Sequence, residues 1–267
     1  MKITLKDGVV KEFDKAMSVY DIALSISEGL ARNACAGIVD GQTKDLRFIV
    51  DKDAQVSICT FEEEAGKEAF RHTASHVMAQ AVKRLYPDTK LAIGPSISEG
   101  FYYDFDREKP FSPEELEAIE KEMKKIAKED LKLERFELPR AEAIALMKEK
   151  DEPYKVELIE DLPEDAVISF YKQGEFTDLC AGPHLMSTGK VKAIKILSSS
   201  GAYWRGDEHN KMLQRFYGIS FPKASQLEEH LQKLEEAKQR DHRKIGKQLN
   251  LFMTHELVGA VLPMYLP

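Results

Sequence analysis

The first sixty residues change hydrophobic period twice, and this change limits the folds open to the chain more than any other feature. Ile3 and Leu5 alternate with polar residues, and Val56 and Ile58 do the same near the end of the segment, as half-buried strands require. Between these runs, apolar residues recur at helical spacing at positions 19, 22, 23 and 26. The resulting order, strand-strand-helix-strand-strand, predicts a small β-grasp domain of the ubiquitin-like type.

Turn and cap residues mark the joints of this first domain. The dipeptides Asp7-Gly8 and Asp40-Gly41 are typical of tight turns between paired strands. Ser18 followed by Asp21 resembles a capping box, and Gly29 is expected to end one short helix. The composition then turns acidic and small from residue 62 to 68, which predicts a domain boundary near residue 62.

The region from 63 to 222 mixes helical and strand signals. Helices are predicted over 70–85, after the cap at Ser112, and from Pro139 through Met147. Runs rich in aromatic and β-branched residues predict strands at 93–105, 156–159, 167–171 and 191–197. The fold class is therefore α+β, with a larger second domain built on an antiparallel sheet.

The last part of the chain divides at residue 247. Residues 223–247 are heavily charged and carry leucines at helical spacing, which predicts a solvated linker helix. Residues 248–267 turn apolar again and are interpreted as the start of a third domain.

Charge and cysteine usage narrow the class of protein. The formal net charge is −7, so overall attraction cannot hold a polyanion, and a nucleic acid would need a local basic strip or a shaped pocket. Three scattered cysteines do not make a disulfide framework and favour a reducing compartment. With no signal sequence and no apolar run long enough to span a membrane, the expected location is the cytoplasm.

Two pairs of metal-ligating or proton-handling residues carry the chemistry. His72 and His76 lie four apart on a predicted helix, so both imidazoles leave the same face. Cys180 and His184 are also four apart, in a segment that Gly182-Pro183 must fold into a tight loop. Either pair alone is more often structural. Together they offer a ligand set for tetrahedral zinc, or a metal-free site that holds a water with Asp178 and a lysine.

Six sequence strings make the resemblance specific. They are RHTASH (71–76), AIGP (92–95), GFYYD (100–104), TDLCAGPH (177–184), GAYWRGD (201–207) and NKMLQRFYG (210–218). Together they resemble the editing domain of bacterial-type threonyl-tRNA synthetases, and the first domain resembles the TGS module of that family. The resemblance implies residues 1–62 as the TGS domain, 63–222 as the editing domain, 223–247 as the linker helix and 248–267 as the start of the class II catalytic domain.

The resemblance also implies a role for each matching residue. His72 and His76 would position the ester and the attacking water, with His72 favoured for proton transfer, and Lys155 would supply positive charge. Asp178, Cys180 and His184 would complete the pocket wall. Gly94 and Tyr103 would line the pocket for the terminal adenosine and serine. The implied reaction is hydrolysis of serine from wrongly charged threonine tRNA.

Cofactors and partners follow from the same resemblance. The editing reaction is expected to need no cofactor, whereas ATP, Mg and Zn belong to the aminoacylation domain, which this chain is expected to lack. The expected partner is the acceptor end of tRNA(Thr) carrying serine, with no membrane partner. A homodimer is expected for the full-length enzyme and a monomer for this part of it.

Two alternative functions remain open from the residues. One is a zinc-dependent hydrolase, or a trans-editing protein of the alanyl-tRNA editing type, with His72, His76, Cys180 and His184 as ligands. The other is a non-catalytic tRNA-docking module in which the histidines are structural.

Overall fold

A computed structural model describes residues 1–240, 245–246, 248–249, 251–253 and 264–265. The chain separates into two compact units, Met1–Pro222 and Lys223–Pro267. Among the described residues, no helix combines the length and apolar character needed to cross a membrane.

The N-terminal residues form the predicted β-grasp sheet, with strand order β2-β1-β7-β4-β5. The strands are β1 (Lys2–Leu5), β2 (Val10–Glu12), β4 (Ala36–Val39), β5 (Gln42–Lys44) and β7 (Ala54–Cys59), and a short β3 (Met17–Ser18) pairs with β6 (Ile49–Val50). β1 and β7 run parallel at the centre, and every other pair in the sheet is antiparallel.

The helical part of this domain differs from the sequence prediction. Ser18 caps α1 (Val19–Ile26) as expected, by accepting the N–H of Asp21. The prediction of a single helix ended by Gly29 is wrong, because Ser27 is extended and caps a second helix, α2 (Glu28–Asn33). A serine that can satisfy the N–H of Leu30 starts a new helix there, and Gly29 lies within its first turn.

The larger domain is built on a five-stranded antiparallel sheet. Its order is β14-β15-β10-β8, with β9 also paired to β10. The strands are β8 (Lys90–Leu91), β9 (Ser96–Ile97), β10 (Gly100–Asp106), β14 (Ala193–Tyr203) and β15 (Met212–Phe221). The single strand predicted over 93–105 is thus a hairpin, β9 and β10, turned through residues 98–99.

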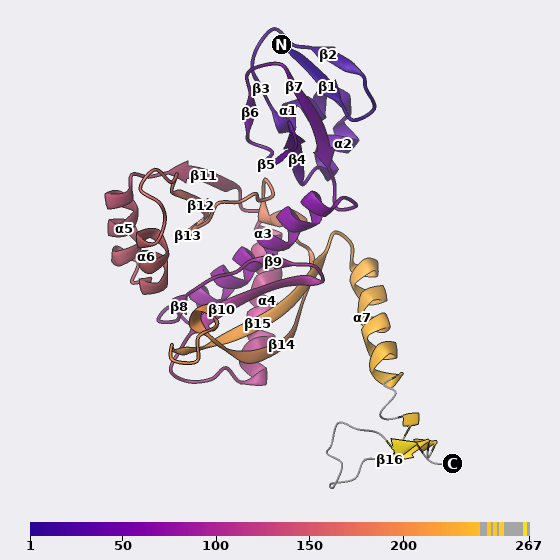
Figure 1. The fold of residues 1–267 in the computed structure, drawn as a ribbon, viewed down its shortest axis with the longest axis vertical. Coiled ribbons are helices and arrows are strands. Elements are labelled where there is room, and N and C mark those ends of the chain that lie inside the picture. Colours follow the sequence, from indigo (N-terminus) through magenta and orange to yellow (C-terminus); the bar gives the residue numbers. More distant parts are fainter. Residues whose placement is uncertain (241–244, 247, 250, 254–263, 266–267) are drawn as a thin grey trace. The chain divides into compact units, whose positions relative to one another are not determined.

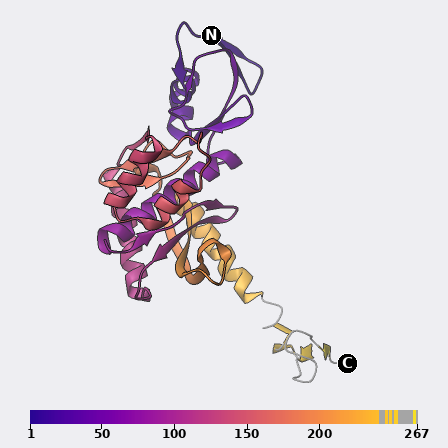
Figure 2. The same cartoon turned by 60° about the vertical axis from the view of Figure 1, so that its left-hand side comes forward.

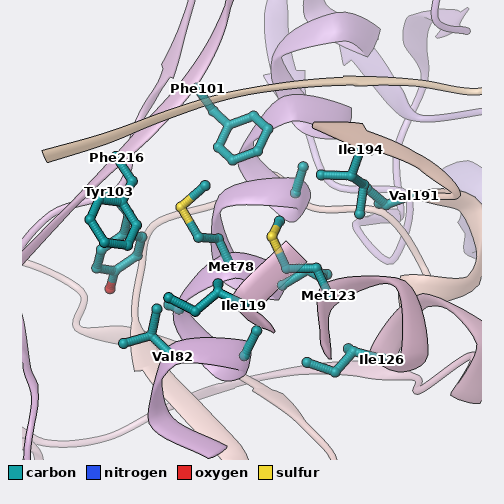
Figure 3. Packing of buried hydrophobic residues seen from close by; sticks show 14 of the residues in the cluster. Met78, Val82, Phe101, Tyr103, Ile119, Met123, Ile126, Val191, Ile194 and Phe216 are labelled. Carbon is teal, nitrogen blue, oxygen red and sulfur yellow. The ribbon is translucent and has the colours of Figure 1, made fainter. Parts of the chain in front are cut away.

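Two helices cover one face of this sheet. α3 (Glu64–Leu85) and α4 (Pro113–Glu129) share one apolar core with β10, β14 and β15 (Figures 1 and 2). In Figure 3 the side chains of Met78 from α3, Met123 from α4, and Phe101 and Phe216 from the sheet point toward one another. The ring of Tyr103 lies in the same cluster, so the core fixes the place from which its hydroxyl reaches out.

A smaller α/β layer carries the remaining elements. β11 (Leu133–Glu137), β12 (Ser169–Gln173) and β13 (Phe176–Leu179) form an antiparallel sheet beside α5 (Arg140–Glu149) and α6 (Pro153–Glu160). The strand predicted over 156–159 is wrong, because this segment is the body of α6. Pro153 provides a helical first turn, and Ile159 is buried against α5, so tertiary packing overrides the β-branched composition.

Two short 3₁₀ segments complete the first unit, η1 (Thr188–Lys190) and η2 (Trp204–Gly206). The second unit contains α7 (Ala224–Gln239) and the paired β16 (Phe252–Met253) and β17 (Met264–Tyr265). The linker helix predicted over 223–247 is present up to Gln239, whereas residues 241–244 and 247 lie outside the described residues. Most of the predicted third domain, 248–267, lies outside them as well.

Candidate functional site

The two helix histidines meet the loop histidine in one ring cluster. His72 and His76 leave the same face of α3, as their spacing predicts, with ring centroids 5.3 Å apart. The ring of His184 lies against both, at 4.2 Å from each centroid. Two turns of one helix and a loop more than a hundred residues away in sequence therefore bring their imidazole rings together.

The loop that follows β13 brings the thiol to this cluster. Cys180 Sγ lies 3.2 Å from His72 Nε2 and 3.1 Å from His184 Nε2. Its backbone is fixed because the N–H of Cys180 donates to Ser169 O and its carbonyl accepts from Ser169 Oγ. The bend is then completed by Gly182, in the left-handed region, and by a cis bond to Pro183.

A buried threonine decides where the proton on His184 lies. Thr73 Oγ donates to the carbonyl of Ala69, so its oxygen can only accept from its other neighbours. It accepts the N–H of Leu185 at 2.9 Å and faces His184 Nδ1 at 3.2 Å. Nδ1 of His184 is therefore the protonated nitrogen, and Nε2 is left to accept from the thiol of Cys180.

A buried ion pair adjoins the histidines. Lys155 Nζ lies 2.7 Å from Asp178 Oδ1, and the Tyr103 hydroxyl donates to Asp178 Oδ2 at 2.6 Å. The ion pair is almost fully buried, with 3% exposure for Lys155 and 2% for Asp178. The second carboxylate oxygen also lies 3.7 Å from His76 Nε2, so one acid connects the lysine to the imidazoles.

Helix α6 delivers Lys155 because its start is tied to the main sheet. The carboxylate of Glu152, just before the helix, accepts the N–H of Leu91 in β8 at 2.7 Å and pairs with Lys83 at 2.8 Å. The phenol of Tyr154 donates to Asp106 at the end of β10. These three contacts fix the first turn of α6 and hence the direction of the lysine.

Gly94 acts on the site through Tyr103. A Cβ at position 94 would lie 2.0 Å from Cδ2 of the Tyr103 ring, so only glycine leaves the ring in place. The carbonyl of Gly94 accepts from Ser75 Oγ, on the helical turn between the two histidines. Gly94 thus holds Tyr103 against α3.

Burial keeps the imidazoles neutral at physiological pH. It lowers the pKa of His72 to about 4 and that of His76 to about 3, with Asp178 partly opposing the change in both. The pKa of His184 is lowered well below its ordinary value by burial and by the other two rings. Burial also raises the pKa of the Cys180 thiol to about 12. The cluster therefore offers neutral nitrogen acceptors and a protonated thiol.

Asp178 stays ionised although it is buried. Burial by itself would raise the pKa of this carboxyl, but the charge of Lys155 and the hydrogen bonds from Lys155 and the Tyr103 hydroxyl bring it below the ordinary value. The same burial, with the carboxylate as neighbour, raises the pKa of Tyr103 well above its usual range. The phenol is thus a permanent donor to Asp178.

One polar atom in the site has no partner within the described part of the chain. Nδ1 of His76 is buried and makes no hydrogen bond. Leaving a buried polar group unpaired costs about 1–3 kcal/mol. A water or a polar group of a bound molecule that reached this nitrogen would relieve this cost.

The four metal-ligating groups fit zinc. One donor atom from each of His72, His76, Cys180 and His184 lies within 4.8 Å of all the others. Zinc bonds of about 2.0–2.3 Å place tetrahedral ligands about 3.3–3.8 Å apart. Small movements of these side chains would create that geometry, so the donor set accommodates the metal without demanding it.

All eight residues singled out from the sequence belong to this one network, with Gly94 joining it through Tyr103. Their catalytic roles stay predictions. Sequence reasoning missed Thr73 and Ser75, although both lie in the RHTASH string and a buried hydroxyl one residue from a histidine is a usable signal. It also missed Tyr171, whose ring lies 4.4 Å from that of His184 and which carries no motif of its own.

Comparison with known proteins identifies two families and a set of relatives that this chain resembles. The family described as "Threonyl and Alanyl tRNA synthetase second additional domain" matches residues 168–217, and the TGS domain family matches residues 1–60. Over all 267 residues the chain is 62% identical to a threonine–tRNA ligase of Clostridium perfringens and 64% identical to that of Clostridioides difficile. It covers 41% and 42% of those two proteins, so it spans about two fifths of the length of the curated relatives it matches.

Proposed function

We propose that this chain is part of a threonine–tRNA ligase and that its second domain hydrolyses the ester of serine wrongly attached to tRNA(Thr). The observation that carries the proposal is the single network of three neutral imidazoles, a thiol and a buried lysine–aspartate pair. The family with editing-type domains supplies the substrate class, and the network supplies the chemistry.

The histidines handle the attacking water. An ester carbonyl is already reactive, so a held water and a nearby proton acceptor suffice for its hydrolysis. His72 is half-buried and neutral, and its imidazole takes the proton as the water attacks. The unpaired Nδ1 of His76 binds the water or the serine side chain.

The buried ion pair stabilises the charge that develops on the carbonyl. A fixed cation in a site shielded from water stabilises an oxyanion strongly. Lys155 is held in one direction by Asp178 and the Tyr103 hydroxyl. The lysine acts as the electrostatic group, and the acid and the phenol hold it in place.

Cys180 serves as pocket wall rather than nucleophile. With a pKa near 12, the thiol carries almost no thiolate at neutral pH. A thioester intermediate is also unnecessary for the cleavage of an activated ester. The thiol and His184 form the part of the site that contacts His72.

A second, smaller pocket can discriminate between serine and threonine more strongly than their difference in binding affinity allows. Serine lacks one methyl group of threonine, and such a difference gives a binding site only about 1–3 kcal/mol of discrimination. A site that admits serine and excludes the methyl by overlap removes the error after transfer. The closely packed ring cluster favours this kind of exclusion.

The test compares deacylation of seryl-tRNA(Thr) and threonyl-tRNA(Thr) by the purified chain. We expect preferential hydrolysis of the seryl ester, with losses on the order of 100-fold in His72→Ala and Lys155→Ala. His209→Ala and Lys148→Ala, at exposed positions outside the network, are the matched controls. Equal rates on both esters would contradict size exclusion of the threonine methyl group. Binding of tRNA without any deacylation would favour the alternative of a non-catalytic tRNA-docking module.

A zinc-dependent hydrolase is the second candidate, favoured by the convergence of four ligand atoms within 4.8 Å. In that case His72, His76, Cys180 and His184 would be the ligands, and one of them would have to leave the ion so that a water could bind there and be activated in place of a general base. Stoichiometric zinc in the purified chain and loss of hydrolysis on chelation would select this candidate. Full activity after exhaustive chelation would exclude it.

For the organisation of the chain we propose the TGS domain at 1–62, the editing domain at 63–222, the linker helix at 223–247 and the start of the catalytic domain at 248–267. The whole enzyme would join threonine to tRNA with ATP, Mg and Zn and would act as a homodimer. The tRNA acceptor end is then the partner of the site described above.

A further inference from the structure

The loop that carries Cys180 and His184 is held from outside its own domain. Arg47, between β5 and β6 of the N-terminal domain, donates from Nη2 to the carbonyl of Leu185 at 2.9 Å. Its Nη1 lies 3.5 Å from the carbonyl of His184. A guanidinium thus covers two successive carbonyls directly after the catalytic loop, 138 residues away in sequence.

Asp45 aims this guanidinium and also reaches the loop itself. Its Oδ1 accepts from the backbone N–H and from Nη1 of Arg47, both at 2.8 Å. Its Oδ2 accepts the hydroxyl of Tyr171 at 2.9 Å and the N–H of His184 at 3.3 Å. One buried carboxylate therefore connects the N-terminal domain to both sides of His184.

Tyr171 passes this constraint on to the ring and the bend. Its ring packs at 61° against that of His184, with centroids 4.4 Å apart. A Cβ at Gly182 would lie 2.2 Å from the Tyr171 hydroxyl oxygen, so the loop backbone rests directly on this phenol. Moving the hydroxyl away from Asp45 would release the Gly182 bend and the His184 ring together.

The same segment has a second attachment to the N-terminal domain a few residues on. Lys190 donates to the carbonyls of Arg32 and Ala34 at the end of α2, where a cation is favoured. Between the two attachments, Met186 packs against the core of the N-terminal domain. The segment 184–190 is therefore fastened at both ends and in the middle.

From these contacts we propose that Asp45 and Arg47 are positioning residues of the hydrolytic site, so that the N-terminal domain completes the site in the second domain by fixing the loop of Cys180 and His184. The functional part of this inference rests on the proposed hydrolysis, whereas the mechanical part does not. Loss of either residue leaves the histidines of α3 in place and frees the loop that packs against them.

The mechanical part is tested by the rate at which iodoacetamide modifies Cys180, followed by peptide mass spectrometry in the whole chain. Cys35 and Cys59 are buried and provide internal references. After treatment with a chelator to remove any protecting metal, we expect Asp45→Asn and Arg47→Ala to speed modification on the order of tenfold, because each variant loses charged hydrogen bonds to the loop. The matched controls, Glu12→Gln and Lys52→Ala, change exposed side chains of the same domain and should leave the rate unchanged.

Unchanged modification in both variants would overturn the proposal. Circular dichroism checks that each variant is folded, and where one is not, Tyr171→Phe decides, because it removes the same hydrogen bond without altering the N-terminal domain. An unchanged rate in folded Tyr171→Phe would then count against the proposal in the same way.

The functional part is tested by deacylation of seryl-tRNA(Thr). We expect kcat to fall on the order of tenfold in Asp45→Asn, with KM changed less than about threefold, because the geometry of the site and not ester binding is affected. A rise in KM alone would refute a positioning role. If the unmodified chain does not hydrolyse the ester, the proposed function fails, and the Cys180 measurement still decides whether the N-terminal domain holds the loop.

Discussion

Replacing Lys155 by methionine tests how much the buried ion pair with Asp178 contributes to stability. The substitution keeps an unbranched chain of similar length and removes only the ammonium, 2.7 Å from Asp178 Oδ1. At that distance, and with an effective dielectric constant of about 20, the lost attraction is about 6 kcal/mol before relaxation. Asp178 retains the Tyr103 hydroxyl at 2.6 Å, which leaves a net loss of about 3–5 kcal/mol, as is usual for a broken buried pair.

The loss should depend on pH, and the sign follows from Asp178. With Lys155 present its pKa is lowered, so the pair contributes stability above the unfolded pKa of about 3.9, and this is lost as pH falls through the folded value. Without Lys155, burial becomes the dominant influence and raises the pKa of Asp178. The variant then loses stability as pH rises through that value. The contribution in the wild type is already present at pH 4.5, so it is the change in the variant that makes the deficit larger at pH 8 than at pH 4.5.

Trp204 makes this measurable, since it is the single tryptophan of the chain. Its ring lies 5.0 Å from Tyr154 on α6, and its indole N–H donates to Glu157 on the same helix, so its fluorescence reports on the element that carries Lys155. We expect a lower urea midpoint in Lys155→Met, with an unchanged m-value.

Two further variants serve as controls for the Lys155→Met result. Lys155→Met combined with Asp178→Leu should recover much of the loss, and exposed Lys148→Met should show none. An equal midpoint shift at pH 8 and pH 4.5 would refute the reasoning.

Three other predictions concern the reaction. Because burial lowers the pKa of His72 to about 4, initial rates of seryl ester hydrolysis should stay level as pH falls toward 5 and drop only when the imidazole gains a proton near 4; a drop centred at 6.5 would contradict this. Gly94→Ala should lower kcat at least tenfold and the free energy of unfolding by about 1–3 kcal/mol, because its Cβ displaces the Tyr103 ring. A urea midpoint and a hydrolysis rate equal to those of the wild type would argue against that contact. Cys180→Ala should keep the rate of hydrolysis within about tenfold of the wild-type rate, and quenched reactions should yield no acyl-enzyme. Complete inactivation of a folded variant would instead indicate that Cys180 is the nucleophile.

Local patterns predicted the elements whose signals lie in a few neighbouring residues. The β-grasp, the capped start of α4 at Ser112 and the shared face of His72 and His76 all follow from periodicity and caps. The strand predicted at 156–159 failed because Val156 and Ile159 serve equally well in a half-buried helix, and only packing against α5 decides between the two.

The long-range parts of the site had no local signal. Asp45 and Arg47 are an ordinary acid and base in a loop of the first domain, and nothing in their neighbourhood predicts a contact with His184. The lysine was assigned through its family motif and not through its pattern, since an isolated lysine is usually on the surface. Burial of a charged side chain is decided by its partner, here Asp178, which lies on a different element.

The way α3 begins has a consequence for how such chains can vary. The carboxylate of Glu63 accepts from the N–H and the hydroxyl of Thr60, and a Cβ on Gly66 would lie 1.7 Å from the carbonyl oxygen of Thr60. The helix therefore follows the last strand of the N-terminal domain directly, with no flexible linker between them. Each added residue in a helix turns everything beyond it by about 100°. A one-residue insertion between Gly66 and His72 would therefore turn both imidazoles out of the ring cluster. The same insertion at the exposed Asp40-Gly41 turn would leave the rotational phase of the helix unaltered.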